Sequence, residues 1–229
     1  MLHAPKEIKS VLNEFIDSSK LQNEEIVKKA IKDLQNSMKT NPKFYKAYLG
    51  KNYFDVNFIV ENMVNKLNAF KSDFNTVREM SICNNFRKIY KHYPTGKYFG
   101  ELGMEHVYQK NYDLYSSKNS KNFATFLNSS NKSPVKGKVL SIEYAYEDSF
   151  YMNVNYDNRS TQIPTVINDK LLSNYDKSDI TLFKLNGENS PLNNTKHFID
   201  DSSKGFTTEY FQYIISIKNS KATEPLGNI

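Results

Sequence analysis

The spacing of apolar residues changes near Gly96, and this change most limits what the chain can fold into. Before Gly96, apolar residues recur every three or four positions, as in IKSVLNEFI and EEIVKKAIKDLQNSM, which is typical of helices. After Gly96, short segments rich in β-branched and aromatic residues predict strands. Helices followed by strands that alternate with helices or long loops predict an α/β fold. Its sheet should be mixed and partly parallel, and its N-terminal half rich in helix.

The predicted elements have approximate bounds. Two long helices are expected between residues 54 and 92, both packed on the sheet, and Pro94 and Gly96 should end the second. A short helix is expected at KNFATFL. The last strand, in YFQYIISIK, is apolar on both sides and should therefore be central in the sheet. The expected strands lie near residues 97–102, 138–146, 180–185 and 210–217.

Composition and charge exclude several classes of partner. A chain of 229 residues with 38% hydrophobic residues is long enough for one large domain with a packed core. The net charge of +6 comes mostly from lysines interleaved with acids, which is typical of solvated helix faces, so no nucleic-acid partner is expected. No apolar run approaches about 18 residues, so no membrane span is expected.

Sequence signals for cellular location are few. The single cysteine, Cys83, leaves the compartment undecided. No signal peptide is visible, which favours the cytoplasm. Abundant Lys, Asn, Ile and Tyr are typical of an AT-rich, bacterial genome.

The segment TGKYFGELGMEH, residues 95–106, is the first candidate site. If KYFGEL is a strand, His106 follows its carboxyl end, which is where open α/β sheets bind ligands. Glu101 and Glu105 are then placed to hold the imidazole in one tautomer or to act as bases. The alternative interpretation is an ordinary strand end with a surface histidine.

The preceding helix, which contains VREMSICNNF, adds polar residues to this candidate site. Arg78 and Asn85 fall on neighbouring turns, and Glu79 adjoins Arg78. A buried arginine requires a carboxylate or an anionic ligand, because unpaired burial of its charge is costly. An arginine–glutamate pair on the surface of an ordinary helix is the alternative.

Taken in order, these residues resemble the erythromycin esterase-like and ChaN/Tiki-like superfamily. The shared order is a helix with R-[DE]-x-x-x-x-x-N, a strand, G-x-x-H, a helix and a strand. The closing TTEYFQYIISIKNSKATEPL also resembles the end of these esterases. The residues that match are Arg78, Glu79, Asn85, Gly103 and His106.

The extent of the resemblance implies a domain organisation. It covers residues 54–226 and leaves residues 1–50 as a helical extension. The N-terminal G-E-x-H strand of these families has no counterpart before residue 54. The resemblance therefore implies a single domain over residues 1–229 that is incomplete at its N-terminus.

The resemblance also implies an activity and a set of residues. The activity is hydrolysis of an ester or lactone without a cofactor, in which His106 activates water and Arg78 holds a polarised oxygen. Glu101 or Glu105 would orient His106. The implied partner is a small-molecule substrate, and the implied substrate-binding residues are Glu79, Asn85 and Tyr108.

Other functions fit the same residues. In a Tiki-like metal-dependent hydrolase, His106 with Glu101 or Glu105 would bind a divalent metal ion. In a ChaN-like relative without catalytic activity, His106 and nearby tyrosines such as Tyr108 would bind haem. A third class binds a partner through its helices, with the hydrophobic helix FDVNFIVENMV as the interface. Separately, the sheet edge left by the missing strand is expected to recruit a second copy or an upstream segment, and hydrolysis would then be weak.

Overall fold

The computed structural model of the chain forms two compact units, Met1–Ser81 and Ile82–Ile229, and each is described by itself. The division falls inside a long helix, whereas the sequence predicts a boundary between residues 50 and 54. The prediction of one incomplete domain over residues 1–229 stays a prediction. The structure describes residues 3–21, 23–71, 73–110, 122–152, 158–161, 166–167, 170–171, 175, 177–190, 193 and 206–221.

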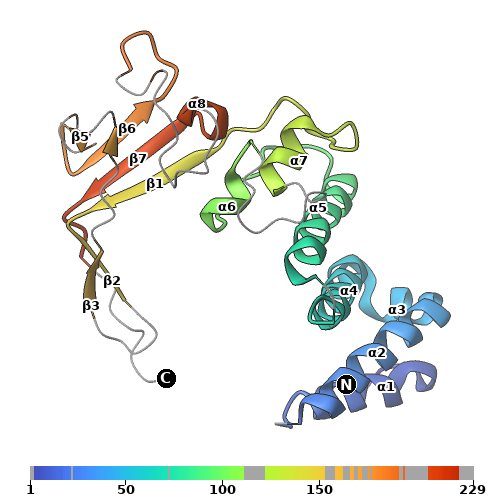
Figure 1. The fold of residues 1–229 in the computed structure, drawn as a ribbon. Coiled ribbons are helices and arrows are strands. Elements are labelled where there is room, and N and C mark those ends of the chain that lie inside the picture. Colours follow the sequence, from blue (N-terminus) through green and yellow to red (C-terminus); the bar gives the residue numbers. More distant parts are fainter. Residues whose placement is uncertain are drawn as a thin grey trace. The chain divides into compact units, whose positions relative to one another are not determined.

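The first unit is helical (Figure 1). The side-chain oxygen of Asn23 accepts hydrogen bonds from the backbone N–H groups of Glu25 and Ile26, which caps one helix. Pro42 occupies the first turn of the next, where its missing N–H leaves no hydrogen bond unmade. The elements are α1 (Lys6–Ser18), α2 (Glu24–Thr40), α3 (Pro42–Leu49), the 3₁₀ turn η1 (Gly50–Asn52), α4 (Tyr53–Ala69) and the start of α5 (Phe74–His92).

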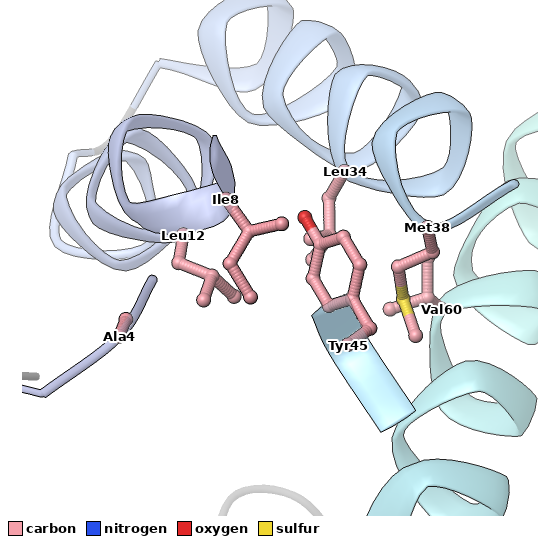
Figure 2. Packing of buried hydrophobic residues seen from close by; sticks show 7 residues of the cluster. All are labelled: Ala4, Ile8, Leu12, Leu34, Met38, Tyr45 and Val60. Atoms are coloured by element: carbon pink, nitrogen blue, oxygen red, sulfur yellow. The ribbon is translucent and has the colours of Figure 1, made fainter. Parts of the chain in front are cut away.

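The core of the first unit lies between these helices (Figure 2). Tyr45 of α3 is fully buried, and its hydroxyl donates a hydrogen bond to Ser37 Oγ at 2.8 Å. Burial of each large aliphatic side chain contributes about 1.5–3 kcal/mol, so the apolar stripes of these helices hold the unit together. The buried residues of this core are Ala4, Ile8, Leu12, Leu34, Met38, Tyr45 and Val60.

The second unit contains a three-stranded sheet with the strand order β1-β7-β6 (Figure 1). Strand β7 is parallel to β1 and antiparallel to β6, so the sheet is mixed and partly parallel, as the sequence predicts. After α5, the elements of the second unit are α6 (Met104–Val107), α7 (Phe123–Ser129), β1 (Ile142–Glu147), β2 (Ser149–Met152), β3 (Asn158–Thr161), β4 (Val166–Ile167), β5 (Lys170–Leu171), β6 (Ile180–Lys184), α8 (Thr207–Tyr210) and β7 (Tyr213–Lys218).

Most of the predicted elements are present. The predicted strands near 138–146, 180–185 and 210–217 correspond to β1, β6 and β7, and the last of them is central, as expected. The long helices α4 and α5 and the short helix α7 are also confirmed. Packing of both long helices on the sheet stays a prediction, because α4 belongs to the first unit and the sheet to the second.

The predicted strand at 97–102 is wrong. These residues have no regular secondary structure, and every residue from 91 to 103 is exposed. A strand requires a hydrogen-bonded neighbour and usually a buried face, and this segment has neither among the described residues. The next regular element is the one-turn helix α6.

The core of the second unit lies on one face of the sheet. In the register of the strands, Glu143 lies beside Ile214, and Ala145 lies beside Ser216. Ala145, Ile214 and Ser216 are buried, whereas the alternate residues Tyr144 and Tyr146 are exposed. We call the buried side the inner face and the other the outer face. The buried residues of this core are Tyr108, Ala145, Leu185, Tyr210, Phe211 and Ile214.

Candidate functional site

His106 is a buried residue of α6, and only 7% of it is exposed. Its backbone N–H donates a hydrogen bond to the Gly103 carbonyl at 2.9 Å, which closes the single turn of the helix. The prediction that His106 follows the end of a strand is wrong, because residues 97–102 form no strand. Helix α6 instead packs against β1 and α7, and this packing places His106 at the border of the core.

Tyr108, two residues after His106, lies at the centre of the aromatic part of this core. Its ring meets the rings of Tyr210 and Phe211 edge to face, with centroids 5.5 and 5.2 Å apart. Its backbone carbonyl accepts a hydrogen bond from the Thr125 hydroxyl at 2.8 Å. Tyr108 therefore joins α7 to the sheet, and its predicted contact with substrate stays a prediction.

Glu143 is a buried carboxyl group that the sequence does not single out. It lies on the inner face of β1, two residues before buried Ala145 and beside buried Ile214. Its Oε2 is buried and has no hydrogen-bond partner within the described residues. Burial raises the pKa of Glu143 to about 7, because an ionised carboxylate loses its hydration there.

A network of amide side chains fixes the geometry around these residues. Gln109 and Gln212 each donate an amide N–H to the other's side-chain oxygen, both at 2.9 Å. Asn128 of α7 donates to Gln109 at 2.9 Å, and Gln212 accepts from the Ser141 backbone N–H at 2.8 Å. The network links the segment after α6, helix α7 and both parallel strands, so it holds the polypeptide around His106 and Glu143 in place.

Both carboxylates predicted to orient His106 are exposed. Glu101 lies in the irregular segment before α6, and Glu105 lies on the outside of α6. Exposed carboxylates act on an imidazole only weakly, since water screens them. Their orienting role stays a prediction.

The predicted residues of α5 divide between the two units. Arg78 and Glu79 belong to the first unit and Asn85 to the second. Arg78 is exposed rather than buried, while Glu79 and Asn85 are half-buried. A cleft shared by Arg78 and His106 stays a prediction, because each unit is described by itself.

The metal site and the haem site stay predictions. Within the described residues, no group of three or more His, Cys, Asp or Glu side chains is arranged to hold a metal ion. The second unit also has a pocket of about 460 Å³, and none of the predicted site residues lines it. It is lined by Arg87, Tyr90, Lys91, Pro94, Lys132, Ser133 and Pro134.

None of the helices in the described ranges is long and apolar enough to cross a membrane.

Two signals in the sequence bear on Glu143, and they point in opposite directions. In SIEYAYE, the alternation of Ile142, Tyr144 and Tyr146 suggests that these side chains face the core and that Glu143 faces water. The small residues Ser141 and Ala145 flank Glu143 on its own face and leave room there. The structure agrees with the small residues, because Glu143 lies on the inner face of the sheet with Ala145.

Comparisons with protein-family models, with curated proteins and with solved structures find no match to this chain. Its assignment to a family therefore rests on the residues of its own sequence and is a proposal. The chemistry of the site is argued below from His106, Tyr108 and Glu143.

Proposed function

We propose that the second unit carries a hydrolytic site for an ester or lactone, with His106 as the base that activates water. The observation that carries the proposal is the burial of His106 in α6, which packs against the core strand β1. A buried imidazole interacts more strongly with a reacting group than an exposed one, because less water screens it. The reaction class comes from the erythromycin esterase-like motif that includes Gly103 and His106.

Glu143 supplies the second proton-transfer group in this proposal. Its pKa of about 7 leaves the carboxyl group partly protonated at neutral pH, as a general acid requires. His106 takes a proton from water as the oxygen attacks the carbonyl carbon, and Glu143 donates a proton to the departing alcohol. The products are a carboxylic acid and an alcohol, or one hydroxy acid from a lactone.

The expected rate is low, because the group assigned to stabilise the developing oxyanion is exposed to solvent. Arg78, which the resemblance assigns to this role, is exposed and belongs to the first unit. Loss of such a group typically costs about 100- to 1,000-fold in rate. We therefore expect slow turnover of activated esters, with the base contributing most of the acceleration.

A hydrolysis assay with matched variants tests the proposal. The purified chain, His106→Ala and Glu143→Gln are compared on a nitrophenyl ester and on a simple lactone. His92→Ala, at the exposed end of α5, is the control for an equivalent change elsewhere. General-base catalysis typically contributes about 100-fold or more, so His106→Ala should lower the rate by that factor while His92→Ala does not. Equal rates for the chain and His106→Ala would contradict the proposal and favour the incomplete-domain hypothesis.

A further inference from the structure

The outer face of the sheet carries two uninterrupted rows of apolar side chains. The register aligns Tyr144 with Ile215 and Leu182 in one row. The second row consists of Tyr146, Ile217 and Ile180. Both rows cross all three strands and contain no charged residue, although the chain has 31 lysines and arginines.

These rows are open to solvent at both margins of the sheet. Ile180 and Leu182 on β6 are 67% and 61% exposed, and Tyr144 and Tyr146 on β1 are 46% and 38% exposed. The two tyrosine rings lie nearly parallel, with centroids 6.5 Å apart, so they form one continuous surface. With exposed Leu140 just before β1, the open side chains present on the order of 500 Å² of apolar surface. This area is in the upper part of the range of about 300–600 Å² for the largest apolar patch of a monomer, and such patches are often functional.

We propose that the outer face is a homotypic interface, on which the sheet of a second copy of this chain packs face to face. A stable dimer buries roughly 800 Å² per partner, and the open side chains supply more than half of that area. The remainder comes from half-buried Ile215 and Ile217 of β7 and from a third row, which consists of Ile142, Tyr213 and Lys184. Two packed sheets of this kind form a sandwich with a spacing of about 10 Å.

The distribution of side chains makes the face complementary to itself. A two-fold axis parallel to β7, midway between the two sheets, brings β1 of one copy over β6 of the other. Tyr144 then meets Leu182 of the second copy, and Tyr146 meets Ile180, so the aromatic margin covers the aliphatic margin. No like charges meet within the two rows. The charge in the third row, on Lys184, lies opposite Ile142 of the second copy, so the two lysines do not face each other although each copy has a net charge of +6.

This interface differs from the sheet edge that the sequence suggested. Along an edge, a second copy would add a strand through backbone hydrogen bonds. On the outer face it contributes side chains only, so charge substitutions at Tyr144 or Leu182 are the sensitive test.

Sedimentation of the full chain and of single variants provides the first part of the test. At about 1–100 μM, the chain should sediment as a dimer of 26.6 kDa protomers. Tyr144→Lys and Leu182→Lys should each weaken the dimer by about thirtyfold or more. Phe99→Lys, a change at an exposed residue outside the sheet, should leave it unchanged. Circular dichroism establishes that each variant is folded.

A charge-pair variant tests the geometry itself. In Tyr144→Lys with Leu182→Glu, each lysine meets a glutamate of the other copy, so the double variant should regain most of the affinity that Tyr144→Lys loses. A chain that stays monomeric at 100 μM would overturn the proposal. So would a dimer that Tyr144→Lys and Leu182→Lys leave intact, or a face that binds only a different protein.

Discussion

The core of the first unit and the outer face of the sheet contain similar side chains in opposite environments. Leu34 of α2 is buried among neighbouring helices (Figure 2), whereas Leu182 of β6 is largely exposed. Helices α1 to α4 enclose the buried core of the first unit, although Ile59, Phe70 and Met80 in that unit are exposed. On the outer face of the sheet, the two apolar rows stay open at both margins. Apolar pattern therefore shows which side of an element is to be buried, but not whether the same chain covers it.

The inner face of the sheet makes the contrast sharper. It is covered, yet it carries Glu143, whose buried carboxyl group has a raised pKa. A carboxyl group is usually more stable in water, and an aromatic ring is usually more stable when it is buried. Both kinds of side chain on this sheet therefore occupy the less favourable environment. We interpret the position of Glu143 by the proposed chemistry and the exposure of the tyrosines by the proposed interface.

The largest expected change in stability comes from a substitution in the buried core of the first unit. Leu34→Ala should lower the free energy of unfolding of the first unit by about 2–5 kcal/mol, because it removes buried contacts and leaves a cavity. Urea unfolding followed by circular dichroism measures the effect. Leu21→Ala, the same substitution at an exposed site in this unit, should change stability by less than about 0.5 kcal/mol. Equal losses for the two variants would show that this core does not hold the unit.

A smaller effect is expected from Glu143, and it depends on pH. The pKa of Glu143 is about 7 in the folded chain, against an ordinary value of 4.5. Between these values the folded state holds a proton that the unfolded state releases, so stability is greatest at low pH and falls as pH rises towards 7. The loss is on the order of 3 kcal/mol, at about 1.4 kcal/mol per pH unit.

Glu143→Gln should remove this loss, because the amide cannot ionise. Relative to the unmodified chain, the variant should therefore gain stability between pH 4 and pH 8. Hydrogen exchange of the β1 and β7 amides at several pH values measures the difference. A difference that does not change with pH would mean that Glu143 is ionised in the folded chain and is not the proposed acid.

The smallest effect compares two tyrosine hydroxyls. Tyr45→Phe should cost the first unit about 1 kcal/mol, since it removes the hydrogen bond to Ser37. Tyr144→Phe, at an exposed ring of the outer face, should cost less than about 0.5 kcal/mol. Thermal unfolding of both variants checks the prediction, and a larger cost at Tyr144 would reverse the comparison between the regions.

Much of the fold could be predicted because its signals are local. Asn23 and Pro42 mark helix starts by their own chemistry, and β7 is central because both of its sides are apolar. The segment 97–102 was predicted as a strand from its composition, but composition does not supply a neighbouring strand. Pairing depends on residues far apart in sequence, so a short isolated pattern cannot establish it.

Of the two residues that carry the proposed function, the sequence singles out His106 but not Glu143, for a related reason. His106 stands out beside Gly103, and the structure buries it at the border of the core. Glu143 does not stand out, because the alternation of β1 suggests that it faces solvent. Which face of β1 is covered is decided by α6, Tyr108 and the residues around α8, and no local pattern within β1 records their positions.

Hydrogen exchange at two protein concentrations, about 1 and 100 μM, tests most directly whether the outer face is completed by a second copy. Amides of β1, β6 and β7 should be at least about tenfold better protected at the higher concentration, because dimerisation stabilises only the sheet. Amides of α2, whose core is complete within the first unit, should exchange at the same rate at both concentrations. Sheet protection that is independent of concentration would contradict the account.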